Sequence, residues 1–226
     1  PLKLARHMAM SPMDIAETLA PLVPTEGGIE KVWAARPGFI NLSLSVGWLA
    51  EQVDTIRHAG EAYGDVDVGS GTRVQVEFVS VNPTGPLHVG HARGAVFGSA
   101  LANILAAAGH DVQREYYVND AGPQMELFYQ SLYARYLQLH GQDAPIPEGG
   151  YVGEYPVELA ASIDEQDGEV YLRMSPADAL KAIGARGLEK AIAAIRADLD
   201  RLRVEYDNWF DESSLFESGR TDWAMR

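Results

Sequence analysis

The sequence predicts an α/β fold in which a parallel sheet and its helices follow a small α+β domain. Apolar residues alternate with polar ones from Val74 and continue to Val81, as expected for a strand buried in a parallel sheet. A helix-like pattern then runs to Gly109, and residues 112–118 form a second β-prone run. A strand, a helix and a strand within about 45 residues indicate a βαβ unit, in which ligands bind at the carboxyl ends of the strands.

The residues before this sheet indicate a small unit of their own. Ser11 and Pro12 are typical of a helix N-cap and a first helical residue, which predicts a short helix. Two β-prone runs, residues 29–34 and 39–44, then flank a Pro-Gly turn, and residues 47–59 return to a helical pattern.

A glycine-rich stretch separates the two parts. Residues 60–72 contain four glycines and several acids, which is typical of a crossing between domains. We therefore expect an N-terminal α+β domain at residues 1–70 and the sheet domain at residues 71–226.

The second half of the sheet domain has a mostly helical pattern after Asp120. A glycine- and proline-rich segment, residues 141–156, predicts a loop. Ser175 is a predicted N-cap for a helix whose apolar stripe continues to Leu202. We expect these helices to form an insertion at about residues 140–200.

Composition narrows the function classes. The chain has 226 residues, 46% of them hydrophobic, and a formal net charge of −14. It has no cysteine, so disulfides and thiolate metal sites are excluded, and no apolar run is long enough for a bilayer. We expect a cytoplasmic protein with no membrane partner and no protein-held metal. The acidic balance argues against nonspecific attraction to polyphosphate, so any nucleic-acid contact must be local.

A histidine pair lies at the predicted turn from the first strand into its helix. Residues 83–91 read Pro-Thr-Gly-Pro-Leu-His-Val-Gly-His, which places His88 and His91 at a helix N-terminus, where free N–H groups and the helix dipole favour anionic oxygens. Imidazoles there can donate to phosphate oxygens during transfer at phosphorus. Proline fixes φ and Gly85 permits a positive φ, so the loop can pass close to a ligand, while Gly90 leaves room between the rings for a bulky group. A helix cap and a surface histidine remain the alternative.

An extended set of motifs carries a family resemblance. Residues 76–95 (VEFVSVNPTGPLHVGHARGA) and 114–122 (REYYVNDAG) resemble bacterial arginyl-tRNA synthetases, which are class I aminoacyl-tRNA synthetases. Residues 37–42 resemble the tRNA-contacting N-terminal domain of that family, and residues 207–210 together with 213–219 resemble a segment after its insertion. The resemblance implies a Rossmann-like (HUP-type) catalytic domain, arginine activation by ATP with Mg²⁺, transfer to tRNA(Arg), and a monomer.

The resemblance also implies site residues. The catalytic pair would be His88 and His91, matching the signature histidines of the family. The residues expected to bind ATP are Pro83, Thr84, Gly85, His88, Gly90 and His91. The residues expected to bind arginine are Ser80, Asn82, Asp120 and Gln124. For Asn82, capping of its own turn stays open as an alternative. For Asp120, which ends the second strand, an N-cap of the next helix stays open.

Parts of the family pattern do not occur in these 226 residues. The lysine-rich second signature is absent, and the residues that read the guanidinium group and the anticodon-binding domain are expected after Arg226. We therefore expect that this polypeptide alone does not aminoacylate tRNA. Two other interpretations stay open. Another HxGH nucleotidyltransferase would show a Gly-x-Phe-Asp-Pro approach, which residues 82–86 do not fit, and a noncatalytic tRNA-binding paralogue would keep the scaffold alone.

Overall fold

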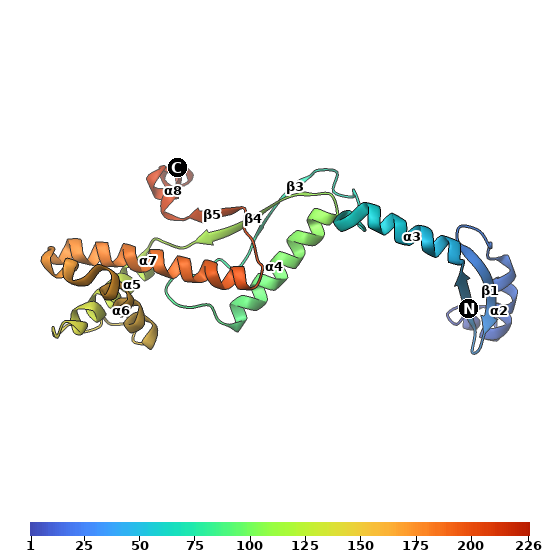
Figure 1. Ribbon diagram of the computed structural model, residues 1–226, viewed down its shortest axis with the longest axis horizontal. Coiled ribbons are helices and arrows are strands. Elements are labelled where there is room, and N and C mark those ends of the chain that lie inside the picture. Colours follow the sequence, from blue (N-terminus) through green and yellow to red (C-terminus); the bar gives the residue numbers. More distant parts are fainter. The chain divides into compact units, whose positions relative to one another are not determined.

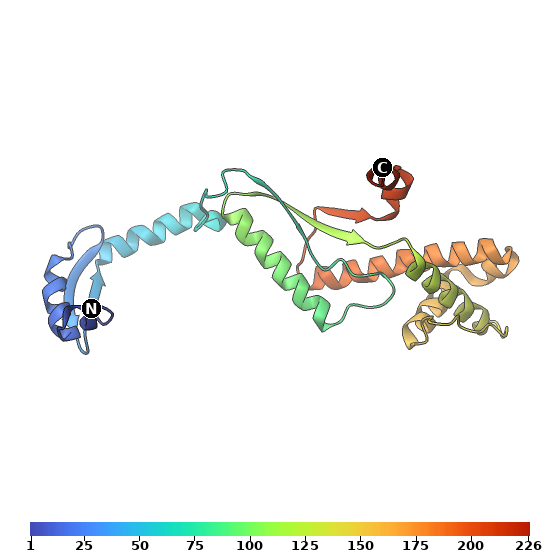
Figure 2. The ribbon, with the colours of Figure 1, turned by 180° about the vertical axis from the view of Figure 1, so that it is seen from behind.

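The chain folds into two compact units. The computed structural model describes residues 1–226, and the units are Pro1–Asp65 and Val66–Arg226. Their division falls inside the glycine-rich stretch of residues 60–72. Figure 1 colours the chain from its N-terminus to its C-terminus, and Figure 2 shows it from behind.

The first unit is built on an antiparallel hairpin, as the sequence predicts. Ser11 accepts a hydrogen bond from the Asp14 N–H at 3.1 Å, so the predicted N-cap is confirmed. Ile15 and Ala16 of that helix are buried. The elements in order are α1 (Ala5–Met8), α2 (Pro12–Leu19), η1 (Ala20–Leu22), β1 (Ile29–Ala35), β2 (Phe39–Leu44), α3 (Val46–Ala59) and η2 (Gly60–Ala62).

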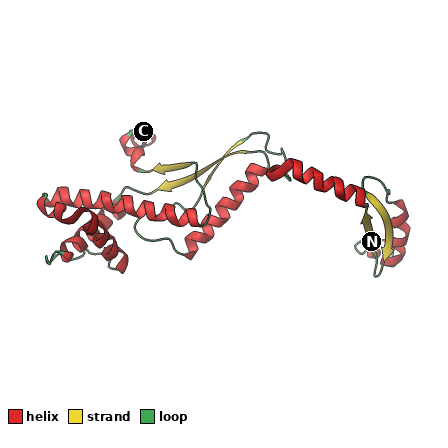
Figure 3. Ribbon diagram, in the orientation of Figure 1, coloured by secondary structure: helices red, strands yellow, loops and turns green.

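The second unit contains a three-stranded parallel sheet of order β3-β4-β5 (Figure 3). Strand β3 (Arg73–Glu77) and strand β4 (Asp111–Val118) flank helix α4 (Val89–Ala107), which confirms the predicted βαβ unit. Strand β5 (Asn208–Asp211) was not predicted, because four residues are too few to show a periodic pattern. None of the helices is both long and apolar enough to cross a membrane.

The first strand is shorter than the sequence predicts. In the structure β3 ends at Glu77, because the backbone turns into the left-handed region at Val79, with φ of 68°, and at Ser80, with φ of 44°. A β-branched residue rarely adopts this conformation, so an apolar run through Val81 gives no local sign of the turn.

Helices α5 (Pro123–Leu139), α6 (Glu154–Asp167) and α7 (Pro176–Arg201) form a helical body, with η3 (Gly168–Arg173) between the last two. Helix α6 was not predicted as an element, and it begins inside the segment expected to be a loop. Pro156 lies in its first turn, where proline costs no helical hydrogen bond. The core of this body includes residues of α5, so the helices that pack together begin before residue 140. The core residues are Met125, Phe128, Leu132, Tyr136, Leu159, Ala160, Ile163, Tyr171, Ala179 and Ile183.

A second core joins the sheet to two helices. In Figures 1 and 2, α4 and α7 lie on the same side of the strands. Val76 and Tyr116 of the sheet pack there against Ala95 of α4 and Ile195 of α7. The chain ends with α8 (Ser213–Glu217) and α9 (Arg220–Ala224), which follow β5. The loop after β3 and the start of α4 are therefore held against a packed sheet.

Candidate active site

His88 and His91 cap the helix that they begin. The Nδ1 atom of His88 accepts a hydrogen bond from the Gly90 N–H at 3.1 Å, and the Nδ1 atom of His91 accepts one from the His88 N–H at 3.3 Å. A neutral imidazole whose Nδ1 accepts carries its hydrogen on Nε2. The hydrogen bonds thus assign the same tautomer to both rings, and both Nε2–H groups can donate to a ligand. Capping of the helix uses Nδ1 and binding of a ligand would use Nε2, so the two roles are compatible.

The two imidazoles lie against one another. Their ring centroids are 3.5 Å apart with 22° between the planes. His88 is exposed and His91 is half-buried, so no packed side chains seal the pair. Burial, followed by the charge of His88, lowers the pKa of His91, which favours a neutral ring. Together the rings present two Nε2–H groups that can donate hydrogen bonds at the positive end of α4.

The two glycines of the motif have different surroundings. A Cβ at Gly90 would lie 2.9 Å from Cε1 of His88, so the His88 ring takes up space that a side chain at Gly90 would need. Gly85 does not have a positive φ, and a Cβ there would meet nothing within 4 Å. The left-handed residues of this loop are Val79 and Ser80 instead. Pro83 is fully buried and Thr84 donates its N–H to the Asn82 carbonyl at 2.8 Å.

Two of the predicted arginine-binding residues meet. Asn82 donates from Nδ2 to Oε1 of Gln124, and Gln124 donates from Nε2 to the Tyr151 hydroxyl at 3.1 Å. Asn82 therefore bonds across to α5 and does not cap its own turn with this amide. Ser80 lies on the same loop, but its Oγ accepts the Tyr117 N–H at 3.0 Å. The loop after β3 is thus tied to both β4 and α5.

Asp120 has a partner that the sequence did not suggest. Its carboxylate accepts the Ser213 N–H at 2.8 Å and the Ser213 hydroxyl at 2.6 Å. The N-cap of α5 is Gly122, with no side-chain hydrogen bond, so the capping alternative for Asp120 is wrong. The carboxylate binds the first residue of α8 instead.

Several acids gather where the three strands end. Burial raises the pKa of Tyr117, and the nearby charges of Glu212, Asp120 and Glu77 add to this effect. Burial and the charge of Asp120 raise the pKa of Asp211, while Arg196 opposes the shift. Sequence reasoning missed Glu77, Asp211 and Glu212; their positions at or just after the ends of parallel strands were the available signal. This edge of the sheet favours a positively charged ligand.

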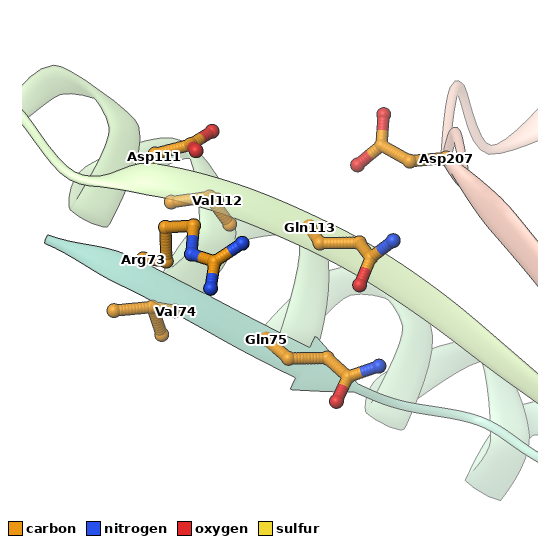
Figure 4. A pocket seen from close by; sticks show the side chains of 7 residues that line it. All are labelled: Arg73, Val74, Gln75, Asp111, Val112, Gln113 and Asp207. Carbon is orange, nitrogen blue, oxygen red and sulfur yellow. The ribbon is translucent and has the colours of Figure 1, made fainter. Parts of the chain in front are cut away.

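Two of the surface hollows in this unit differ in their relation to the predicted site. One, of about 640 Å³, lies along the first halves of β3 and β4, where the side chains of Arg73, Gln75 and Gln113 follow the strands (Figure 4). No predicted site residue lines it. A smaller one, of about 320 Å³, is lined by the His88 turn and by Asp198 and Arg201 near the end of α7. His88 therefore borders an open hollow, whereas His91 is not among the residues that line it.

The chain is similar to known proteins over its whole length. Residues 52–148 match the family described as tRNA synthetases class I (R), catalytic domain, and residues 1–44 match the family described as arginyl tRNA synthetase N terminal domain. Arginine--tRNA ligase of Dehalococcoides mccartyi is 48% identical over 226 residues, which is all of this chain and 40% of that protein. Arginine--tRNA ligase of Oceanobacillus iheyensis is 46% identical over 222 residues, 98% of this chain and 40% of that protein.

Solved structures give the same result. A Campylobacter jejuni protein assigned as an arginyl-tRNA synthetase has a TM-score of 0.66 and 30% identity, over 79% of this chain and 39% of that one. Thermus thermophilus arginyl-tRNA synthetase has a TM-score of 0.53 and 28% identity, over 99% of this chain and 36% of that one. The chain spans about 40% of the length of the relatives that it matches.

Proposed function

Because this chain belongs to the arginyl-tRNA synthetase family, we propose that the protein containing it activates L-arginine with ATP and transfers the arginyl group to tRNA(Arg). The observation that carries this proposal is that the Nδ1 atoms of His88 and His91 both accept hydrogen bonds at the start of α4, which leaves both Nε2–H groups as donors. In this scheme the chain supplies the first part of the catalytic site.

The first reaction joins arginine to the nucleotide. An oxygen of the arginine carboxylate attacks the α-phosphorus of ATP, and the bond from that phosphorus to the bridging oxygen breaks. The products are arginyl-adenylate and pyrophosphate. Negative charge on the phosphoryl oxygens is greatest as the α-phosphorus becomes five-coordinate, and preset donors stabilise that state most. We assign this role to His88 and His91.

The second reaction moves the arginyl group to tRNA. The terminal ribose hydroxyl of the tRNA attacks the arginyl carbonyl carbon and forms an ester, the bond from that carbon to the phosphate oxygen (a mixed anhydride) breaks, and AMP leaves with its electrons while the hydroxyl proton is released. We propose that residues 1–70 are the tRNA-contacting accessory domain and that residues 71–226 are the first half of the catalytic domain with its helical insertion.

For ATP, we propose that the turn from Pro83 to His91 binds the nucleotide. Its ligands would be Thr84 and the two histidines, with Pro83, Gly85 and Gly90 shaping the backbone. The turn precedes a helix of 19 residues, whose positive end favours phosphate.

For arginine, we propose contacts with Ser80, Asn82, Asp120 and Gln124. The first two lie on the loop after β3, and Asn82 contacts Gln124. The acids at the ends of the strands would attract the cationic substrate. The hydrogen bonds of Asp120 to Ser213 would place its charge.

Magnesium is proposed to arrive with ATP as part of the substrate. The chain contains no group of three or more histidine, aspartate or glutamate residues that could hold a metal ion. Magnesium commonly keeps waters and phosphate oxygens as ligands, so a protein cage is not required. We further propose a cytoplasmic monomer.

The test is amino-acid-dependent pyrophosphate exchange by the full-length protein that includes this chain. Arginine, lysine and glutamine would be compared, each with and without tRNA. Of the three amino acids, we expect only arginine to support exchange. Exchange that ignores the amino acid would favour another HxGH nucleotidyltransferase, and tRNA binding without any exchange would favour a noncatalytic paralogue.

A further inference from the structure

The loop between β3 and the histidine turn contains an unfavourable backbone segment. Val79 and Ser80 are consecutive left-handed residues, and neither is a glycine. Such residues are energetically unfavourable and persist only where the surroundings determine them. Asn82 follows this segment after one residue, Val81, so whatever holds the segment and Val81 also places the backbone of Asn82.

Tyr116 of β4 holds one end of the segment. Its hydroxyl accepts the Val81 N–H at 3.2 Å and donates to the Val81 carbonyl at 3.1 Å, across 35 residues of sequence. The side chain is 1% exposed, and its ring stacks on Trp209 of β5 with centroids 4.3 Å apart. One buried hydroxyl therefore satisfies both backbone groups of Val81.

Tyr206, which lies between α7 and β5, holds the other end. Its hydroxyl donates to the Phe78 carbonyl at 3.1 Å, across 128 residues. The Tyr206 ring stacks on Phe78 with centroids 4.6 Å apart, and it meets the Tyr116 ring edge-on at 5.5 Å. The two phenol groups thus bind the residues on either side of Val79 and Ser80.

We propose that Tyr116 and Tyr206 are positioning residues for arginine binding, because they hold the residues on either side of the left-handed segment, which contains Ser80 and leads through Val81 to Asn82. Neither tyrosine touches the reacting atoms in this proposal. Their hydroxyls act through the backbone at Phe78 and Val81, and the ring contacts keep the hydroxyls in place.

The chemistry of the hydroxyls fits a fixed clamp. Burial raises the pKa of Tyr116 to about 12 and also raises that of Tyr206. Both groups therefore keep the proton that they donate to a carbonyl throughout the pH range of an aminoacylation assay. The clamp does not open by ionisation.

The inference rests on the proposed function, and its test separates the two. Tyr116→Phe and Tyr206→Phe remove only the hydroxyls. The matched control is Tyr136→Phe, because Tyr136 is 0% exposed and its hydroxyl also donates to a backbone carbonyl, that of Gly168, at 2.7 Å in the helical body. All three variants of the full-length protein would be assayed by pyrophosphate exchange, with KM for arginine, KM for ATP and kcat measured separately.

We expect Tyr116→Phe to raise KM for arginine by about tenfold, as loss of hydrogen bonding to the loop should, and Tyr206→Phe to raise it less. KM for ATP should stay within about twofold, and Tyr136→Phe should leave KM for arginine unchanged.

Three results would overturn the inference. One is an unchanged KM for arginine in both site variants. Another is an equal rise in KM for arginine and for ATP. The third is unfolding of both site variants while Tyr136→Phe stays folded, which would assign the hydroxyls to stability alone. If the wild-type protein shows no arginine-dependent exchange, the proposed function itself fails.

Discussion

The carboxylate of Asp120 accepts two hydrogen bonds from Ser213, one from its N–H at 2.8 Å and one from its hydroxyl at 2.6 Å. The two residues are 93 positions apart, and their contact ties the end of β4 to the start of α8. A residue proposed to attract arginine is therefore also a structural anchor, and the two roles can be separated by substitution.

Ser213→Ala removes one of the two donors and leaves the charge of Asp120 in place. We expect the free energy of unfolding to fall by about 1 kcal/mol, with little change in KM for arginine. Ser214→Ala is the matched control, because Ser214 lies on the same short helix and its hydroxyl donates to the carbonyl of Asp211 at the end of β5. Asp120→Asn removes the charge and should raise KM for arginine by about tenfold. Urea unfolding and pyrophosphate exchange measure the two effects. A purely structural Asp120 would lower stability in both Ser213→Ala and Asp120→Asn without changing KM.

Substitutions of His91 should separate capping from phosphate contact. Asparagine places its amide near the Nδ1 position and can still accept the His88 N–H, but it lacks a group at Nε2. Glutamine reaches the Nε2 position and loses the cap. We expect His91→Asn to lower kcat by about a hundredfold with near-normal stability, and His91→Gln to retain more activity while losing about 1 kcal/mol of stability. Pyrophosphate-exchange kinetics measure kcat, and thermal unfolding measures stability. If the same variant kept more of both activity and stability, the result would argue against separate roles for Nδ1 and Nε2.

Gly90→Ala should displace the His88 ring, because the added Cβ would lie 2.9 Å from its Cε1 atom. We expect the exchange rate to fall by at least about tenfold, since small misplacements of a catalytic group are costly. Gly94→Ala, on the same helix, is the control, because a Cβ there meets nothing within 4 Å. Alanine favours a helix over glycine by about 1 kcal/mol, so neither variant should be less stable for that reason. Equal rates in the two variants would contradict the packing argument.

The proposed exchange activity should be lost in acid only below the usual pKa range of histidine. Burial and the charge of His88 lower the pKa of His91 from its ordinary value, so the ring stays neutral as the pH falls through about 6.5. Once protonated, Nδ1 of His91 donates and cannot accept the His88 N–H. By linkage, a lowered folded-state pKa means that this contribution to stability is present at neutral pH and is lost as the pH falls through the folded-state pKa. A pH profile of kcat should show an acid limb below about 6.5. An acid limb above that value would contradict the assignment.

The local sequence pattern was enough to predict part of this structure. The alternation from Val74 to Val76 and the run through residues 112–118 predicted two strands correctly, because each strand buries one face and the signal repeats every second residue. Ser11 predicted its own helix cap, since the partner N–H of Asp14 is three residues away. The histidine turn could be predicted for the same reason, because both hydrogen bonds that cap α4 lie within residues 88–91.

The sequence by itself determined the βαβ unit, the family and the histidine pair at the start of α4, because all of these depend on neighbours close along the chain. Only the tertiary structure decided where β3 ends, what Asp120 binds and which side chain fills the space at Gly90. The backbone at Val79 and Ser80 is unfavourable on its own, and it is held by hydroxyl groups 35 and 128 residues from their partners. Contacts over such separations leave no periodic trace in the sequence, because they arise only when β4, α7 and β5 pack around the loop.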